Sequence, residues 1–107
     1  MKGSATINAG ACGQITKATA DFDENTGLCT LHIESKCPHF AKAAEKFEGA
    51  KIRPGDEFSW ETSQVHKIMH TNCTHTTCPI PSGILKAVQV AIGKKEPSQA
   101  SITTEKL

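Results

Sequence analysis

The fold is decided by residues 14–35, which read QITKATADFDENTGLCTLHIES. Residues 28–35 alternate between apolar and polar side chains, so that Cys29 and Leu31 share one face of a predicted strand. Residues 14–22 are rich in threonine and small side chains, and they predict a second strand. The intervening segment ends in Asn-Thr-Gly, which suits a turn, so we expect an antiparallel hairpin.

Three helices are predicted after the hairpin. Pro38 suits the first position of a helix over residues 38–48, and Gly49 suits the residue just past its end. A second helix is expected over residues 62–70. Apolar residues recur most regularly at helical spacing over residues 81–92, which therefore predict the strongest helix.

The remaining segments complete the expected architecture. Residues 1–9 are small and polar, and we expect them to form a flexible N-terminus. Residues 100–104 predict a short third strand. We therefore expect one α+β domain over residues 10–107, an antiparallel sheet covered by two or three helices.

Composition narrows the class of function. The chain has 107 residues, with 12 basic and 11 acidic side chains and a net charge of +1, which does not favour nucleic acid or a membrane surface as partner. No signal-peptide pattern is seen at the first residues, so we expect a cytoplasmic protein with reduced thiols. Five cysteines in such a chain favour metal or redox chemistry over a disulfide framework.

The cysteines fall into two groups. Cys29 lies on the inward face of the predicted strand and is expected to be a core residue. Cys12, Cys37 and Cys78 stand beside glycine or proline at the ends of predicted elements. Because the start of one hairpin strand lies beside the end of the next, we expect Cys12 and Cys37 at one edge of the sheet, joined by Cys78 at a helix N-terminus.

A metal site follows from this placement. Cys73 or His75, in the loop before Cys78, would supply a fourth ligand. Four thiolate or imidazole ligands suit a zinc ion or an iron–sulfur cluster. Helix N-termini after Cys37 and Cys78 would lower the cost of thiolate charge.

These motifs resemble a known family, the IscU/NifU-type scaffolds of iron–sulfur cluster assembly, which includes the zinc-binding SufU proteins. The resemblance is carried by Cys12-Gly13, by Ser35-Lys36-Cys37-Pro38 and by His75-Thr-Thr-Cys78 ahead of a helix. It implies an IscU-like fold and a metal held by the three cysteines. The chain also resembles uncharacterised cysteine-rich proteins of anaerobic bacteria and archaea that share Gly-x-Cys-Gly, Ser-x-Cys-Pro and His-x-x-Cys-Pro-x-Pro.

The sequence departs from the scaffold pattern in several places. Gln14 stands where the scaffolds commonly have aspartate, and His75 is three residues from Cys78 rather than adjacent to it. The Leu-Pro-Pro-Val-Lys segment through which the scaffolds dock their chaperone is missing before Cys78. A metal site therefore carries over better than the delivery of clusters to client proteins.

Three hypotheses for function remain open. The first is a small metal-binding protein that holds zinc or an iron–sulfur cluster. The second is a thiol or persulfide sulfur carrier, with Cys37 as the sulfur acceptor and a sulfur-transfer protein as partner. The third is a binding module with structural cysteines, in which Trp60, His66 and His70 are ordinary core, interface or surface residues. No phosphate loop, paired carboxylates or serine nucleophile elbow is seen, so catalysis is not the first expectation.

Overall fold

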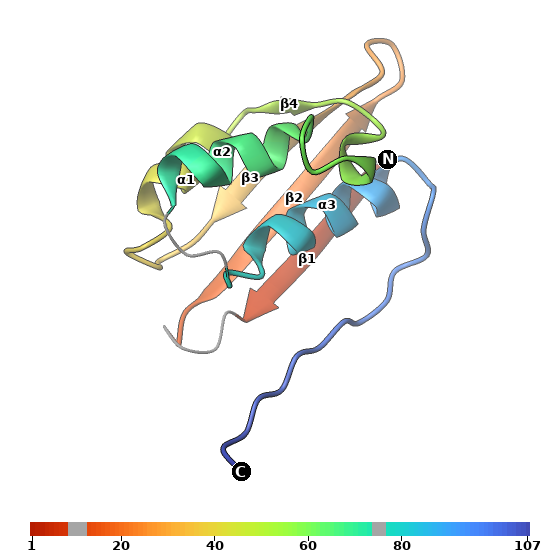
Figure 1. Cartoon of the computed structure of the whole chain (residues 1–107). Coiled ribbons are helices and arrows are strands. Elements are labelled where there is room, and N and C mark those ends of the chain that lie inside the picture. Colours follow the sequence, from red (N-terminus) through yellow and green to blue (C-terminus); the bar gives the residue numbers. More distant parts are fainter. Residues whose placement is uncertain (9–12, 74–76) are drawn as a thin grey trace.

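A computed structural model of the chain describes residues 1–8, 13–73 and 77–107. Figure 1 shows a sheet with helices, and a C-terminal segment that leaves the domain. The elements are, in chain order, β1 (Lys2–Asn8), β2 (Ile15–Asp23), β3 (Leu28–Glu34), α1 (Ala41–Phe47), β4 (Lys51–Ile52), the 3₁₀ turn η1 (Asp56–Phe58), α2 (Gln64–Asn72) and α3 (Ile80–Ala91). The expected α+β class is confirmed.

The four strands form one antiparallel sheet in the order β1-β2-β3-β4. The predicted hairpin is its centre, with Asp23 paired to Leu28 at the turn. Within the turn, the Asn25 N–H donates to Asp23 Oδ1 at 2.8 Å, and Gly27 takes a φ of 73°. Glycine suits this position because it adopts positive φ without a steric cost.

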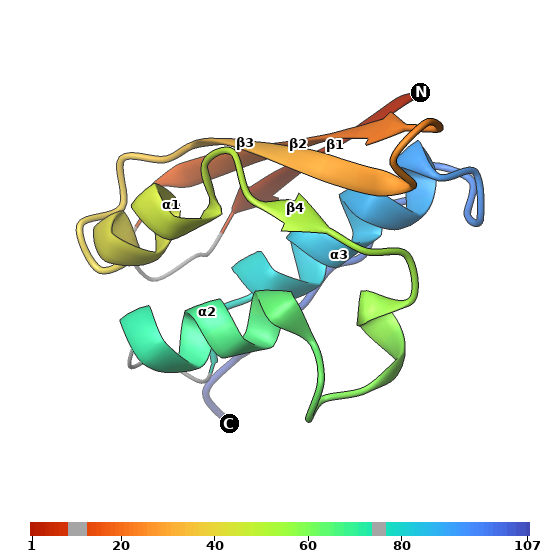
Figure 2. The ribbon, with the colours of Figure 1, turned by 90° about the horizontal axis from the view of Figure 1, so that it is seen from above.

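The helices cover one face of the sheet. Figure 2 shows the sheet above and all three helices below it, with α2 in the layer farther from the strands. Most inward residues of β2 and β3 are buried, namely Thr16, Ala18, Ala20, Cys29 and Leu31, whereas their neighbours along the strands are more exposed. The strands therefore alternate as an antiparallel sheet with one solvated face does.

Small residues let α3 approach β1 and β2 closely. Ala18 and Ala20 of β2 are completely buried. A Cβ atom added to Gly3 of β1 would lie 2.3 Å from the Ala87 carbonyl oxygen of α3. Gly3 is therefore required by contact between two backbones rather than by its own conformation. No helix in the described ranges is long and apolar enough to span a membrane.

Several expected boundaries are wrong. Residues 2–8 were expected to fray, but they form β1, because seven residues pair with β2 and Ile7 enters the core. Residues 100–104 were expected to form a strand, but they carry no regular structure and are exposed. No local pattern predicts β4, which is two residues long and is defined by its pairing with Cys29 and Thr30.

The first helix begins at Ala41 rather than at Pro38. Residues 38–40 form a turn, in which the Phe40 N–H donates to the Cys37 carbonyl at 3.1 Å. Phe40 then packs into the core beside Phe47, with ring centroids 5.9 Å apart. The other two predicted helices are present with their ends shifted by one or two residues.

Candidate functional site

Several elements begin or end at one end of the sheet, seen at the lower left of Figure 1. β1 ends and β2 begins there, because Asn8 pairs with Ile15. β3 ends beside them, since Glu34 pairs with Lys17 near the start of β2. α2 ends and α3 begins at the same end.

We call this region the thiol end, because three described cysteines stand in its connections: Cys37, Cys73 and Cys78. Cys37 follows β3 by three residues, Cys73 follows α2 directly, and Cys78 precedes α3 by two residues. All three are buried or partly buried and pack against the core. The topology thus places at one end of the sheet three cysteines that are up to 41 residues apart in the sequence.

Hydrogen bonds fix the backbone at Cys37. Its N–H donates to Ser35 Oγ at 3.3 Å, and Ser35 Oγ shares a 2.7 Å hydrogen bond with Thr16 Oγ1 of β2. Thr16 is itself buried, so this link joins the loop after β3 to the start of β2 inside the protein. The Cys37 side chain is 8% exposed. The expectation that Cys37 caps a helix is wrong, because Phe40 occupies the cap of α1.

Cys73 and Cys78 lie at opposite kinds of helix end. Cys73 is the C-cap of α2, and its N–H donates to the Met69 carbonyl at 2.8 Å. Cys78 precedes Pro79, which is the N-cap of α3. The partial positive charge of a helix N-terminus therefore lies near Cys78, whereas Cys73 is near the partial negative charge of a C-terminus.

Two of the predicted ligands, Cys12 and His75, lie outside the described residues. Within residues 1–8, 13–73 and 77–107, no three histidine, cysteine, aspartate or glutamate side chains are grouped closely enough to hold a metal ion. The described part of the thiol end therefore supplies three cysteines at one end of the sheet, without a complete set of ligands. The metal site stays a prediction.

Cys29 provides the contrast within the same protein. It is completely buried and lies between Phe22 and Ile52 on the neighbouring strands. Burial raises the pKa of its thiol, and the nearby negative charge of Asp21 raises it further. Its predicted position in the core is confirmed.

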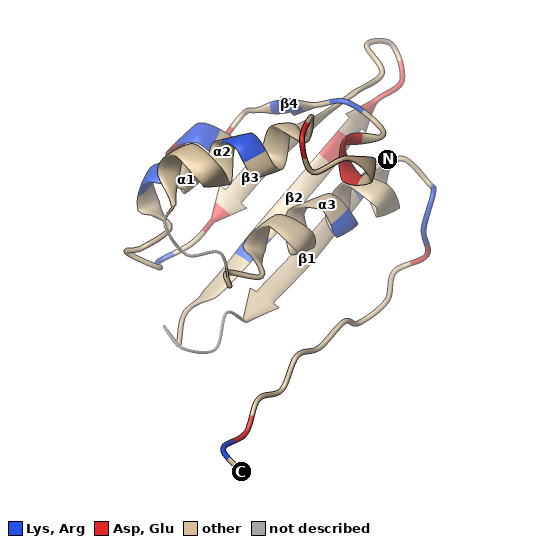
Figure 3. Ribbon diagram, viewed as in Figure 1, with Lys and Arg blue, Asp and Glu red and all other residues tan. Residues whose placement is uncertain are grey.

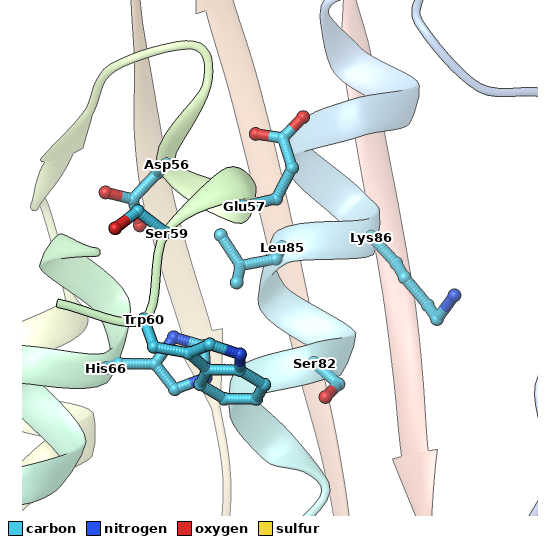
Figure 4. Close-up of a pocket in the computed structure, with 8 residues that line it drawn as sticks. All are labelled: Asp56, Glu57, Ser59, Trp60, His66, Ser82, Leu85 and Lys86. Carbon is cyan, nitrogen blue, oxygen red and sulfur yellow. The ribbon is translucent and has the colours of Figure 1, made fainter. Parts of the chain in front are cut away.

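A surface cleft lies against α3, and none of the described cysteines lines it. It has a volume of about 230 Å³ and is formed by η1, Trp60, the first turn of α2 and one face of α3 (Figure 4). Trp60 is 81% exposed and meets the His66 ring edge-on, with centroids 4.6 Å apart. Trp60 is therefore no core residue, and His66 lines a cleft rather than an open surface.

Asp56, one of the residues that line this cleft, has a buried carboxylate. Asp56 is 3% exposed, and it accepts hydrogen bonds from the Gln64 N–H at 2.6 Å and the Val65 N–H at 3.2 Å. The Ser63 hydroxyl also donates to Asp56 at 2.8 Å. Asp56 thus satisfies the N-terminus of α2 from outside the helix. The local sequence does not indicate this role, because Asp56 precedes the hydrogen-bond donor Gln64 by eight residues.

In the neighbouring Glu57, only one carboxylate oxygen accepts a hydrogen bond from a described residue. Glu57 Oε2 accepts a 3.4 Å hydrogen bond from Gln89 of α3. Glu57 Oε1 is shielded from solvent, and no described residue donates a hydrogen bond to it. A buried acceptor without a donor is costly, so this oxygen is suited to a ligand that brings one.

Comparison with known proteins gives a family but no activity. The model of the family described as "Family of unknown function (DUF6951)" matches residues 3–104. The chain belongs to this family. The resemblance to IscU, NifU and SufU scaffolds is thereby corrected, because the family found is a different one. No curated protein matches the chain.

Proposed function

We propose that this DUF6951 protein binds a metal through the thiol end, as a zinc ion or an iron–sulfur cluster. The observation that carries the proposal is the placement of Cys37, Cys73 and Cys78 in three separate connections at one end of the sheet. Cys12 would be a further ligand, since its connector joins Asn8 to Ile15 at that same end. His75 stands in the connector between Cys73 and Cys78 and offers an imidazole in place of Cys73.

The physical setting supports this use of the thiols. Structural cysteines are ordinarily buried in the middle of a core, as Cys29 is. Partly buried cysteines beside helix and strand ends can instead reach a common centre while the protein shields it from water. We propose a location in the reducing cytoplasm, where the thiols would stay reduced and able to bind a metal.

The test is anaerobic purification followed by elemental analysis and a visible absorption spectrum. Iron with inorganic sulfide and a coloured spectrum would identify a cluster, and stoichiometric zinc without colour would identify a zinc site. Cys12→Ser, Cys37→Ser and Cys78→Ser should each lower the metal content, and Cys73→Ser and His75→Ala decide which residue is the fourth ligand. Cys29→Ala is the matched control and should keep its metal. Metal content at background in the unaltered protein would overturn the proposal.

The same preparation tests the sulfur-carrier alternative. In that reaction a thiolate attacks the outer sulfur of a donor persulfide, a new S–S bond forms, and the donor leaves as a thiolate. Cys73 and Cys78 are more exposed than Cys37, so they are better placed than Cys37 to meet a donor protein. A mass increase of one sulfur atom on either residue, without metal, would favour this function.

The cleft at Trp60 supports a second candidate function, the binding of a small molecule with a cationic group. An ammonium group could pair with the Glu57 carboxylate after a rotation that turns the shielded Oε1 toward the cleft, while an attached apolar group contacts Leu85 and the indole of Trp60. Trp60 is the only tryptophan, so its fluorescence reports the cleft directly.

Phenethylamine is a suitable probe for this candidate. It should change the fluorescence of Trp60 in a saturable way in the unaltered protein. Glu57→Gln should abolish the change, while Glu61→Gln, at an exposed acid outside the cleft, should preserve it. No saturable change in the unaltered protein, or an equal loss in both variants, would reject the cleft as a site for cations.

A further inference from the structure

β1 forms one edge of the sheet. It pairs with β2 along its whole length, and no described residue pairs with its other side. The strand has seven residues, contains no proline and carries one charged side chain, Lys2. Such an edge presents a row of backbone donors and acceptors that can accept another strand.

The C-terminal segment leaves the domain beside the start of this edge. A Cβ on Gly93, just past α3, would lie 3.5 Å from Met1 Cε, and Gly3 of β1 touches the backbone of Ala91. From there the segment runs in the same general direction as β1 but away from it (Figure 1). All residues from Gly93 onward are exposed, including Ile102 at 84%.

The C-terminal segment, residues 94–107, has a sequence suited to pairing with the open edge of β1. Charged residues stand at 94–96 and 105–106, and the stretch 97–104 between them has none (Figure 3). Residues 100–104 read Ala-Ser-Ile-Thr-Thr, in which β-branched residues favour an extended strand. The segment up to Thr104 also lies within the family match, so it belongs to the domain that the family shares.

The alternation of side chains along β1 is also compatible with an added strand. In β1, Gly3 and Ile7 are buried beneath the sheet, whereas Ser4 and Thr6 face outward. A strand laid along β1 with Ile102 pointing inward would place Ser101 and Thr103 outward. Its outer face would continue the polar face of the sheet, and Ile102 would approach the flank of α3.

We propose that residues 99–105, which are exposed and without regular structure in the arrangement described above, can dock on the sheet as a fifth strand, parallel to β1. The direction is fixed because α3 ends at the start of β1, so the following segment can follow that edge only in the direction of β1. Residues 94–98 are long enough to make the connection, since an extended residue spans about 3.3 Å and neighbouring strands are about 4.8 Å apart. Ile102 would cover Val90 and Ala5, which are both only partly buried.

The occupant of the edge is the protein's own segment rather than a second copy. A tether of a few residues gives the segment an effective concentration on the order of millimolar at the edge, which a second molecule reaches only in concentrated solution. Docking would also protect the protein from edge-to-edge association through β1.

Hydrogen exchange of the full chain, followed by mass spectrometry or NMR, tests the proposal. The amides of residues 100–104 should exchange at least about tenfold more slowly than those of an unstructured peptide of the same sequence. Ile102→Asp should remove this protection, because it would bury a charge against α3. Ser101→Asp, whose side chain faces outward, is the matched control and should retain most of the protection.

Two outcomes would overturn the proposal. Exchange of residues 100–104 at the rate of the free peptide in the unaltered chain would show that the edge stays open. Protection that disappears on dilution, together with a dimer in analytical ultracentrifugation, would assign the edge to a second copy. Neither outcome depends on the metal content, so this proposal and the proposed function are tested separately.

Discussion

Cys29 and Cys37 are eight residues apart in the sequence, and they represent two regions of the protein that are built differently. Cys29 lies in the middle of the sheet, on β3 between β2 and β4, and is completely buried in the core. Cys37 lies at the thiol end, in a connection between elements, with its backbone fixed by Ser35 and Thr16. The middle of the sheet is defined by regular pairing and small residues, whereas the thiol end is defined by turns and helix ends.

Replacements in the two regions are expected to change different properties, stability in the middle of the sheet and metal content at the thiol end. A residue in the middle of the sheet is constrained by packing on every side, so its replacement changes the free energy of unfolding. At the thiol end, Cys73 and Cys78 are only partly buried, so packing constrains them less than it constrains Cys29. If the thiol end binds a metal, its cysteines should determine metal content, whereas Cys29 should determine stability alone.

The largest expected effect is at the contact between β1 and α3. Gly3→Ala places a methyl group 2.3 Å from the Ala87 carbonyl oxygen and 2.9 Å from the Ala91 nitrogen, both in the backbone of a packed helix. Overpacking of this kind costs about 2–3 kcal/mol of unfolding free energy, measurable by urea denaturation. Ser4→Ala, on the exposed side of the same strand, should change stability by less than about 0.5 kcal/mol. Equal effects of the two variants would show that β1 does not pack on α3 as described.

The second prediction concerns Cys29 itself. Cys29→Ala removes a completely buried sulfur and should lower the unfolding free energy by about 1–2 kcal/mol, with unchanged metal content. Cys73→Ala should cost less, about 0.5 kcal/mol, because Cys73 is only partly buried. Chemical denaturation of metal-free samples gives both values. A smaller loss in Cys29→Ala than in Cys73→Ala would contradict the distinction between the two regions.

The middle of the sheet is the part that the sequence predicts best. Alternation in residues 28–35 places Cys29 and Leu31 inward, and Gly27 marks the turn, so the hairpin follows from local pattern. α3 is predicted almost to its ends, because its apolar residues recur at helical spacing over three turns. Local pattern is sufficient there because each element buries one clear apolar face.

Elements that depend on distant partners could not be predicted. β1 has only one large apolar residue, Ile7, and becomes a strand because β2 pairs with it. The N-terminus of α2 is satisfied by Asp56, whose role requires the fold to be known. The cleft at Trp60 arises where η1 meets α3, so no spacing in the sequence indicates it. Of the predicted thiol site, Cys37, Cys73 and Cys78 stand in connections at one end of the sheet. No three ligand side chains of the described residues are grouped closely enough for a metal ion, so the site itself stays a prediction.

Thiol labelling compares the two regions directly. In metal-free protein at pH 7, iodoacetamide should modify Cys73 and Cys78 at least about tenfold faster than Cys29, whose thiol is buried and has a raised pKa. Cys37 should react slowly as well, because it is only 8% exposed. Peptide mass spectrometry over time measures each rate. Metal should protect the thiols of the thiol end together, and protection of Cys73 alone would oppose a shared ion.

The smallest effect is expected at the boundary between the two regions, where β4 is too short to cover all of β3. Glu48 takes over there, accepting a hydrogen bond from the Ile33 N–H at 2.6 Å and contacting His32 Nδ1 at 3.0 Å. The Ile33 hydrogen bond, followed by the one from His32, lowers the pKa of Glu48 below its ordinary value of 4.5. The folded state therefore favours the ionised carboxylate, and the stability it contributes is present above pH 4.5 and is lost as the pH falls through the lowered pKa.

Glu48→Gln should consequently reduce the loss of stability on acidification below pH 4.5, while it lowers stability at pH 7 by less than about 1 kcal/mol, because solvent screens an exposed charge. Unfolding free energies at pH 7 and pH 3.5 for both proteins measure the difference. Glu45→Gln, one turn earlier on the exposed side of α1, is the control and should leave the pH dependence unchanged. If Glu48→Gln kept the full pH dependence of the unaltered protein, the hydrogen bonds that Glu48 accepts at the edge of β3 would not contribute to the pH dependence of stability.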